Sequence, residues 1–335
     1  MIQALNDYLT FVRAGLPYTQ FDLARSGVPP TPLPEPSQSS GPAGLPEAFG
    51  EPIFTRGASG AVFLALLATR IAGARIVASE YPSYPIFSAV AESVGLQDYE
   101  IRRDPGPNSV VGAICQAITD GADVVALQDP HNPTGHELSD SERTEILETC
   151  RHAGVWVLVD RVFADFAHSP EAYASEPNVM VARSYSKSLG IGTERIGWLS
   201  APAQMQPFLT QAQDVLQGQP KKMEPLIRQR LTSLAARHLE SNLALVQRNN
   251  TTLRQWLSVH TEVTSAVEPS TLPFATLQLP STIDSNQFSR ELLRRTGTAT
   301  VPGAYFGLNR DQIRIGLTSP DFSQGLQHIS DFIKK

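Results

Sequence analysis

The sequence has little cysteine, no long apolar run and no excess of positive charge, and each of these absences excludes a class of protein. Cys115 and Cys150 are its two cysteines. Both fall in stretches of helical pattern, so they indicate no disulfide framework. The longest plain apolar run, residues 61–68, is far too short to span a bilayer. Residues 1–16 lack the apolar stretch of a signal peptide, so we expect a cytoplasmic protein with no membrane partner.

The charge balance argues against nucleic acid as a partner. The formal net charge is -6 at pH 7, whereas binding to phosphate backbones needs a basic face. Lys221 and Lys222 form a small basic cluster that is typical of solvated surface. At 335 residues the chain is long enough for two domains and a sizeable buried core.

Proline, glycine and serine are concentrated between residues 26 and 52. This composition predicts an extended arm rather than a packed element. The closely spaced prolines of the arm are Pro29, Pro30, Pro32, Pro34 and Pro36.

After the arm, helical patterns alternate with short apolar runs. The expected helices are 60–72, 86–94, 110–119 and 142–152, and the expected strands are 75–79, 123–128, 155–160, 178–184 and 195–200. The runs 124–127 and 155–159 are apolar throughout, which suits strands buried on both faces of a mostly parallel sheet. Strands that alternate with helices predict an α/β fold with crossover connections.

The pattern changes beyond residue 201. A long polar helical region covers 225–259, followed by strands over 274–279 and 312–317 and helices over 287–295 and 322–334. This order predicts a smaller α+β domain joined to the first by a long helix. We place an N-terminal arm with part of the small domain at 1–45, the large domain at 46–235 and the C-terminal small domain at 236–335.

Polar groups follow three consecutive predicted strands. Asn132 follows the first strand, Asp160 ends the second, and Lys187 follows the third. Each has a plain alternative on its own: a turn for Asn132, a helix N-cap for Asp160 and a solvated loop for Lys187. Ligands of open α/β sheets bind beyond the carboxyl ends of the strands. An amide, a carboxylate and an amine at one edge therefore predict a site.

The sequence resembles the fold-type I pyridoxal 5′-phosphate (PLP) enzymes of the class I and II aminotransferase family, from about residue 27 to residue 317. The segments that carry the resemblance are 56–61 (RGASGA), 81–85 (YPSYP), 132–135 (NPTG), Asp160, 184–187 (SYSK), 195–198 (RIGW), 302–307 (PGAYFG) and 313–315 (IRI). The resemblance implies the aspartate aminotransferase-like α/β fold, with a large, mostly parallel-sheet domain that binds PLP and a smaller α+β domain. It also implies a homodimer with active sites at the subunit interface.

The resemblance implies three catalytic residues. Lys187 holds PLP as a Schiff base, the internal aldimine, and then acts as the base at the substrate's α-carbon. Asp160 lies under the pyridine nitrogen and keeps it protonated, so that the ring accepts electrons. Tyr84 stacks on the ring, with packing in the core as its alternative. Asn132 hydrogen-bonds the phenolic oxygen of the ring.

A second set of residues is assigned to the phosphate of PLP. Ala58, Ser59 and Gly60 begin a predicted helix, where small residues let backbone N–H groups approach an anion. An ordinary glycine-rich helix start is the alternative. Ser184 and Arg195 match family positions that hold the same phosphate. Arg195 suits this role as a permanent cation with forked donors, and a surface salt bridge is its alternative.

The substrate is assigned to a third set. Arg314 resembles the family arginine that takes the α-carboxylate in a bidentate pair. Asn132 and the backbone of Gly27 are placed in the same pocket. No set of metal ligands is predicted.

The sequence departs from the family pattern beside Asp160. An acidic residue is expected next, and often a tyrosine three positions on, where Arg161 and Phe163 stand. Phe163 lacks the hydroxyl that donates to the phenolic oxygen of PLP, so we expect a raised pKa of the Schiff base unless Tyr185 supplies a hydroxyl. The N-terminal region is shorter than the family norm, and Tyr18 is one candidate for the residues it contributes to a neighbouring subunit.

These assignments predict a PLP-dependent aminotransferase that moves the amino group of an L-amino acid to a 2-oxo acid. The alternative is another fold-type I PLP reaction: decarboxylation, elimination at a C–S bond or oxidative cyclisation, because fold does not decide reaction type. Arg314 argues against a decarboxylase that leaves the carboxylate unclamped. A non-catalytic protein of this fold is disfavoured because Lys187 is present. No arginine is assigned to a dicarboxylic substrate, and no aromatic cluster to a hydrophobic one.

Overall fold

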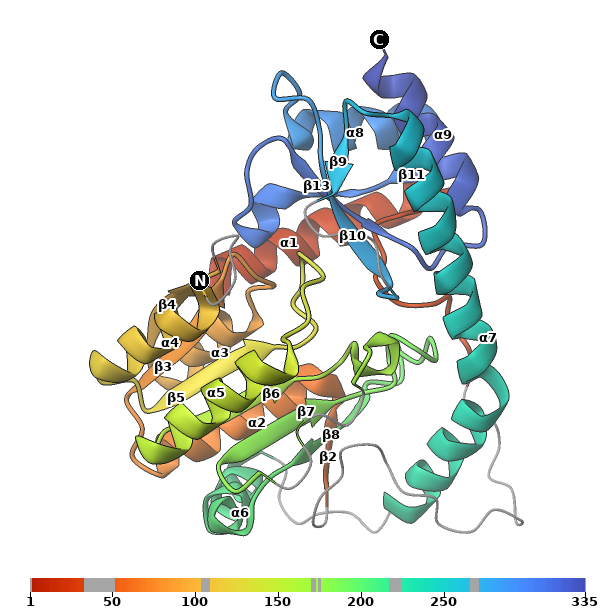
Figure 1. Cartoon of the computed structure of the whole chain (residues 1–335). Coiled ribbons are helices and arrows are strands. Elements are labelled where there is room, and N and C mark those ends of the chain that lie inside the picture. Colours follow the sequence, from red (N-terminus) through yellow and green to blue (C-terminus); the bar gives the residue numbers. More distant parts are fainter. Residues whose placement is uncertain are drawn as a thin grey trace.

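The computed structural model has a large lobe built on a seven-stranded sheet and a small lobe built on two smaller sheets (Figure 1). The structure describes residues 2–32, 52–103, 109–169, 173, 176–216, 224–265 and 271–334. Most of the predicted arm, including Pro34 and Pro36, and the cluster of Lys221 and Lys222 lie outside these ranges.

The large sheet has the strand order β2-β8-β7-β6-β5-β3-β4. Its strands are β2 (Ile53–Arg56), β3 (Ile76–Tyr81), β4 (Gln97–Arg102), β5 (Val124–Gln128), β6 (Trp156–Asp160), β7 (Val179–Arg183) and β8 (Ile196–Ser200). Strands β3 to β7 run parallel, and β8 is antiparallel to both β7 and β2. Every residue of β5 is buried, and in β6 every residue except Trp156, as the sequence predicted for these two strands; β7 is buried throughout as well.

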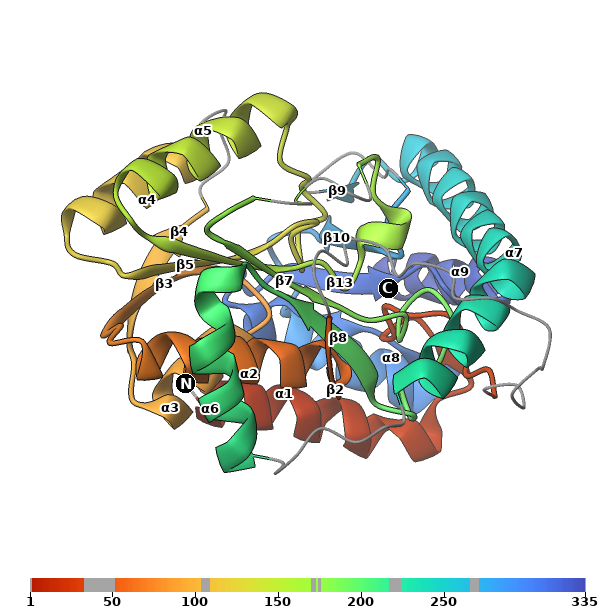
Figure 2. The ribbon, with the colours of Figure 1, turned by 90° about the horizontal axis from the view of Figure 1, so that it is seen from below.

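Helices cover both faces of this sheet (Figure 2). The helices are α2 (Gly57–Ile71), α3 (Ile86–Val94), α4 (Ser109–Thr119), α5 (Asp140–His152) and α6 (Gln206–Leu216). Alternate residues of one strand point to opposite faces. Val124 and Ala126 therefore pack with α2, α3 and α6, whereas Val125 and Leu127 pack with α4 and α5. Cys115 and Cys150 are free thiols within α4 and α5, as predicted.

The small lobe contains segments from both the N-terminal and the C-terminal part of the chain. Its strands are β1 (Phe21–Asp22), β9 (Thr264–Ser265), β10 (Phe274–Gln278), β11 (Thr298–Ala299), β12 (Val301–Pro302) and β13 (Gln312–Gly316), and its helices are α8 (Ser285–Thr296) and α9 (Phe322–Ile333). Strands β12, β13, β10 and β9 form an antiparallel sheet, and β1 pairs in parallel with β11. Their apolar side chains form a core of their own with α8 and α9.

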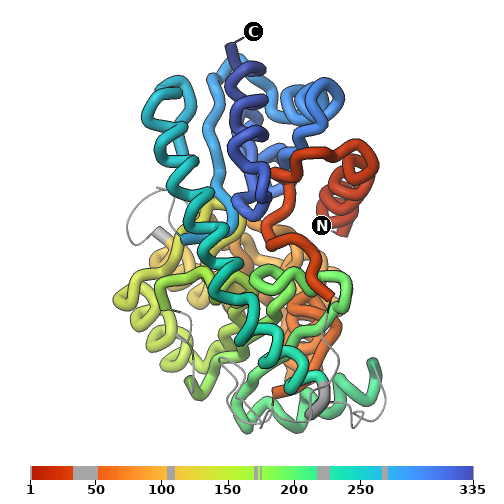
Figure 3. The backbone as a smooth tube through the Cα atoms, turned by 90° about the vertical axis from the view of Figure 1, so that its right-hand side faces the viewer, coloured from red at the N-terminus to blue at the C-terminus, as the bar shows by residue number. Residues whose placement is uncertain are grey.

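Two helices link the lobes. Helix α7 (Glu224–Val259) is 36 residues long and runs from the side of the large lobe to the small lobe (Figures 1 and 3). Helix α1 (Ile2–Gly15) packs against α3 of the large lobe and against the 3₁₀ turn η4 (Gly303–Phe306) of the small lobe. The domain boundaries at 45 and 235 stay a proposal, because residue 45 is outside the described ranges and residue 235 lies inside α7.

Among the helices of the described ranges, none combines the length and apolar character needed to cross a bilayer. Within the same ranges, no group of three or more His, Cys, Asp or Glu side chains is placed to hold a metal ion.

Candidate active site

Three neighbouring strands of the large sheet end at one edge and carry the predicted residues there. The strands β5, β6 and β7 are adjacent and parallel, and Gln128 of β5 is level with Asp160 of β6. Asn132 lies in the loop after β5, and Lys187 in the turn after β7. The structure therefore brings together the amide, carboxylate and amine that the sequence placed at this edge.

Asp160 is a buried carboxyl group at the end of β6. Its side chain is largely removed from water, and Oδ1 accepts a hydrogen bond from the Val162 N–H at 3.0 Å. Burial raises the pKa of Asp160 to about 6, opposed by this hydrogen bond and by the positive charges of Lys187 and Arg183. A ring cation beside Asp160 would favour the ionised form, so a protonated pyridine nitrogen fits this position.

Lys187 is placed so that its amine loses its proton easily. Burial, and after it the positive charge of Arg314, lower the pKa of Lys187, while Asp160 opposes both; the net result is a pKa of about 8. Its Nζ lies 5.8 Å from the centre of the Phe163 ring. Gly27 packs directly on it, because a Cβ there would lie 3.1 Å from both Cα and Cδ of Lys187. Gly27 thus leaves room for the lysine.

An anion cradle is formed where α2 begins. Arg195 lies across this helix start: its Nη2 donates to the Arg56 carbonyl at 3.3 Å, and a Cβ on Gly57 would lie 2.8 Å from the same nitrogen. Arg195 adopts φ 53°, an uncommon conformation for a residue with a side chain. A helix N-terminus beside a guanidinium suits a phosphate. Ala58, Ser59 and Gly60 lie in the first turn of α2.

Ser184 is joined to the cradle through the backbone. Its Oγ donates to the carbonyl of Ile196, the residue after Arg195, at 2.7 Å and accepts the Ser186 N–H at 3.0 Å. The side chain is buried at the end of β7. The residues assigned to the phosphate thus come from α2, β7 and the start of β8, and their individual roles stay predictions.

Arg314 crosses from the small lobe to the large one. It lies on β13 with 1% of its surface exposed. Its Nη1 donates to Asn132 Oδ1 at 3.0 Å, and its Nη2 donates to the Ala24 carbonyl at 2.9 Å and to the Tyr8 hydroxyl at 3.4 Å. Among the described residues no carboxylate pairs with Arg314, and its buried Nε has no hydrogen-bond partner. A buried cation held only by neutral oxygens suits a substrate carboxylate.

Tyr84 stands beside this arginine. Its backbone N–H donates to the Asn132 carbonyl at 3.0 Å, which holds it to the same loop. Its ring meets that of Tyr8 edge-on, with centroids 5.4 Å apart. Burial is the main cause that raises the pKa of Tyr84. Stacking of Tyr84 on the cofactor ring stays a prediction.

Arg161, which stands where the family pattern has an acidic residue, has a charged partner in the structure. Arg161 is 1% exposed, and its Nη1 donates to the Asp129 carbonyl at 2.6 Å and to Asp129 Oδ2 at 3.2 Å. Its guanidinium also lies 5.1 Å from the centre of the Tyr173 ring. Arg161 therefore belongs to a buried ion pair behind the strand ends, and its departure from the family pattern is balanced by Asp129.

Three further residues were singled out from the sequence: Phe163, Tyr185 and Tyr18. The Phe163 ring packs edge-on against Phe274, with centroids 4.8 Å apart. The Tyr185 ring packs against Trp198, with centroids 5.4 Å apart, in the cluster that includes Leu231 of α7. Tyr18 is 70% exposed at the end of the turn η1 (Leu16–Tyr18). Supply of a hydroxyl by Tyr185 stays a prediction.

Sequence reasoning missed the contribution of α1. The structure places Tyr8 against Arg314, Tyr84 and Phe306, with Tyr8 and Phe306 ring centroids 5.5 Å apart. The signal was the helical spacing of Tyr8, Phe11 and Val12, which marks one face of a helix. A period of this kind shows that a face is apolar but does not show which surface it covers.

The residues present fit both ends of PLP. The cradle of α2 and Arg195 suits the phosphate, Asp160 suits a protonated ring nitrogen, and Lys187 suits the aldehyde carbon, because its pKa of about 8 leaves a substantial fraction of neutral amine. The unpartnered Nε of Arg314 leaves a place for a substrate carboxylate next to them.

Comparison with known proteins finds a family profile and relatives that match this chain. The profile of the family Aminotransferase class I and II matches residues 45–329. Capreomycidine synthase from Streptomyces vinaceus is 26% identical over 290 residues, which cover 83% of this chain and 73% of that protein. Valine–pyruvate aminotransferase from Mycobacterium tuberculosis is 27% identical over 299 residues, which cover 84% of this chain and 75% of that protein.

A solved structure shares the fold over the whole chain. A PLP-dependent aminotransferase from Streptococcus suis superimposes with a TM-score of 0.83 at 19% identity, over 99% of this chain and 97% of that one. The predicted aspartate aminotransferase-like α/β fold is therefore confirmed. With the match of the family profile over most of the sequence, the chain belongs to the class I and II aminotransferase family of fold-type I enzymes, and its cofactor is pyridoxal 5′-phosphate.

Proposed function

We propose that this protein is an aminotransferase that moves the amino group of an L-amino acid to a 2-oxo acid. The observation that carries the proposal is the meeting of Lys187 and Arg314 at one site: an amine with a lowered pKa beside a buried guanidinium that has no carboxylate partner in the described part of the chain. An α-amino acid presents the two groups that such a pair would handle, an α-proton and an α-carboxylate.

Each side chain has a task in this reaction. Arg314 binds the α-carboxylate by a bidentate pair, and Asn132, already hydrogen-bonded to its Nη1, holds the guanidinium in place. Lys187 Nζ takes the α-proton, and its pKa of about 8, well below that of an ordinary lysine, suits an amine that must accept and release a proton. Asp160 holds the proton of the ring nitrogen. The cofactor, when bound, supplies the electron sink for the bond that breaks.

A second reaction class is favoured by one relative. The chain is similar to a capreomycidine synthase at about the same identity as to a transaminase. Another PLP reaction on an amino acid, such as elimination at a C–S bond or oxidative cyclisation, is therefore the alternative. Decarboxylation is disfavoured, because Arg314 would clamp the group that must leave. The homodimer and the cytoplasmic location stay predictions.

The test is a spectrum of the protein purified with PLP and freed of excess cofactor. We expect an absorption band of the bound cofactor that is lost in Lys187→Ala and kept in the control variant Lys334→Ala, on an exposed residue near the C-terminus. Addition of a panel of amino acids should convert the cofactor to pyridoxamine 5′-phosphate and release the matching 2-oxo acid.

Other outcomes are equally clear. Release of ammonia or carbon dioxide without pyridoxamine 5′-phosphate would replace transamination by the alternative reaction class. Folded protein that retains no cofactor would contradict the proposal.

A further inference from the structure

A cavity of about 270 Å³ opens on Lys187 between α1, the segment after it and α8. Its lining combines apolar and aromatic side chains with charged ones. The lining includes Tyr8, Phe11, Leu293, Asp22, Arg25 and Lys187. The cavity reaches Lys187 and so adjoins the site described above.

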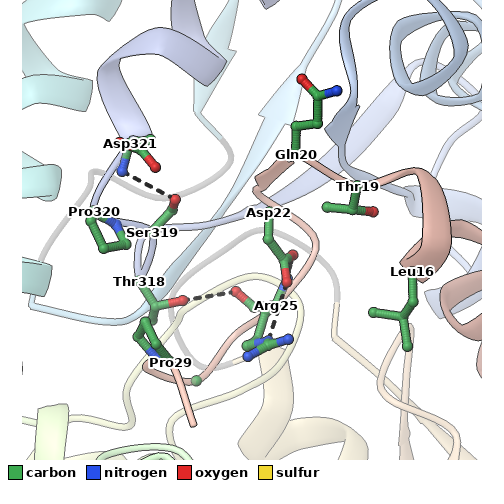
Figure 4. A pocket seen from close by; sticks show the side chains of 11 residues that line it. Leu16, Thr19, Gln20, Asp22, Arg25, Pro29, Thr318, Ser319, Pro320 and Asp321 are labelled. Atoms are coloured by element: carbon green, nitrogen blue, oxygen red, sulfur yellow. Dashed lines mark hydrogen bonds and ion pairs between the residues drawn. The ribbon is translucent and has the colours of Figure 1, made fainter.

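Arg25 stands where this cavity adjoins a second one. The second cavity, of about 320 Å³, is lined by Arg25, Asp22 and Thr19 from the N-terminal segment and by residues 318–321 before α9 (Figure 4). Arg25, Asp22, Thr19 and Leu16 line both cavities. The Arg25 side chain is 39% exposed. Its charge also reaches the reacting lysine, because it is among the causes that lower the pKa of Lys187.

The backbone of Arg25 is fixed against the strand that carries Arg314. Its carbonyl accepts a hydrogen bond from Thr318 Oγ1 at 3.2 Å and lies so close to Gly316 that any side chain there would collide with it. Gly316 is the last residue of β13. The two arginines are therefore held by one structural unit, Arg314 buried and Arg25 at the cavity edge.

The donors of Arg25 are largely unused, whereas the acceptors of Asp22 are used. Asp22 Oδ1 accepts the N–H groups of Ala24 and Arg25 at 3.1 and 2.9 Å, and Oδ2 lies 3.2 Å from Arg25 Nε. In the part of the chain that the structure describes, neither Nη atom of Arg25 donates a hydrogen bond, and the closest contact of its ion pair with Asp22 is made by Nε. Asp22 thus orients the guanidinium of Arg25. The two Nη atoms of Arg25 present four N–H donors to an incoming anion.

We propose that Arg25 selects the side chain of the substrate and that it selects an anionic one, on an amino acid whose second carboxylate meets Arg25 while Arg314 holds the α-carboxylate. A carboxylate fits better than a phosphate, because Arg25 is the one cation besides Lys187 among the described residues that line the cavity. Phe11 and Leu293 pack against the methylene groups between the two carboxylates. The inference rests on the proposed aminotransferase function.

The test compares donors that differ by one group. The rate of pyridoxamine 5′-phosphate formation is measured with glutamate against glutamine and with aspartate against asparagine. We expect the wild type to prefer the acidic member of at least one pair. Arg25→Gln should lower kcat/KM for that acid roughly 10- to 100-fold, the usual effect of losing a hydrogen bond to a charged group, and change the amide little. Arg25→Glu should reverse the preference.

A matched control is Arg13→Gln, which removes an exposed arginine of α1 that lines neither cavity. It should leave both ratios unchanged. Equal losses for acid and amide in Arg25→Gln, with the cofactor band intact, would make Arg25 structural and overturn the inference. So would a wild type that prefers neutral donors, and in that case transamination itself would stand. If no amino acid yields pyridoxamine 5′-phosphate, the proposed function fails and this inference fails with it.

Discussion

The surroundings of Lys187 lower the pKa of its amine. This lowered pKa predicts how the attachment of PLP depends on pH. Only the neutral amine attacks an aldehyde, so attachment of PLP to the cofactor-free protein should accelerate with rising pH and reach half its maximum near pH 8, instead of near the ordinary lysine pKa of 10.5. Rapid-mixing absorbance measurements from pH 6.5 to 9.5 would follow this.

Two variants test the cause of the shift in opposite directions. Arg314 lowers the pKa of Lys187, so Arg314→Gln should move the midpoint to higher pH. Asp160 raises this pKa, so Asp160→Asn should move the midpoint to lower pH. A midpoint that stays in place in both variants would show that burial alone sets the pKa.

The residue at position 163 bears on the pKa of the Schiff base that the bound cofactor forms. The Phe163 ring lies 5.8 Å from Lys187 Nζ and offers no hydroxyl to the phenolic oxygen of PLP. Phe163→Tyr should supply that donor and stabilise the phenolate, so the pKa of the Schiff base should fall. An absorbance titration of both proteins with pH measures it. An unchanged or higher pKa in the variant would show that another hydroxyl, such as that of Tyr185, already fills the role.

The positions of some residues of the site could be predicted from the sequence, and the positions of others could not. Asn132, Asp160 and Lys187 were predictable because parallel neighbouring strands must end at one edge of the sheet, whatever lies above it. Tyr8 and Arg25 were not, because they reach the site through the pairing of β1 with β11 and the packing of α1 on η4. No local pattern in the sequence records such contacts.

At the scale of elements, Gly197 of β8 is required by the start of α2. A Cβ at this position would lie 2.4 Å from the Gly57 carbonyl carbon and 2.7 Å from the Ala58 nitrogen, both of which are backbone atoms. Gly197→Ala must therefore move the first turn of α2 and the cradle. We expect at least a tenfold weaker affinity for PLP, roughly the effect of 1.4 kcal/mol, and a lower melting temperature.

The control for this prediction is Gly112→Ala in α4. Among the described residues nothing lies within 4 Å of the Cβ that alanine would add, and alanine favours a helix interior over glycine by about 0.5–1 kcal/mol. This variant should be slightly more stable and bind PLP as the wild type does. Equal PLP affinity in Gly197→Ala, measured by equilibrium dialysis, would show that the helix start tolerates the shift.

The elements themselves were predictable to different degrees. The central strands β5 and β6 were found because burial on both faces favours an apolar run, which covers 124–127 and 155–159. The edge strand β4 was missed because its sequence, QDYEIR, alternates polar residues with few apolar ones. Helix α5 begins at Asp140, two residues before the predicted start, because Ser139 and Glu142 form a capping box. That signal is local and was readable in the sequence.

At the scale of the whole molecule, the two lobes meet through the loop that carries Asn132. Thr276 of β10 donates its hydroxyl to the Pro133 carbonyl at 2.6 Å, and it is the direct partner of Arg314 across the sheet. Arg314 in turn donates to Asn132. Two adjacent positions of the small sheet therefore hold two adjacent residues of the large lobe, and the relative position of the lobes sets where Arg314 lies against Asn132.

Thr276→Val tests this coupling, because valine keeps the shape and removes the hydroxyl. The buried Pro133 carbonyl would lose its donor, at a cost of about 1–3 kcal/mol in the free energy of unfolding. Since Asn132 shifts with the loop, KM for the amino acid should rise several-fold while the cofactor band stays intact. Thr144→Val, which removes an exposed hydroxyl from α5, should change neither quantity. A lower stability with an unchanged KM would mean that the lobes are positioned by α1 and α7 instead, and that the loop bearing Asn132 is rigid without its contact to the small sheet.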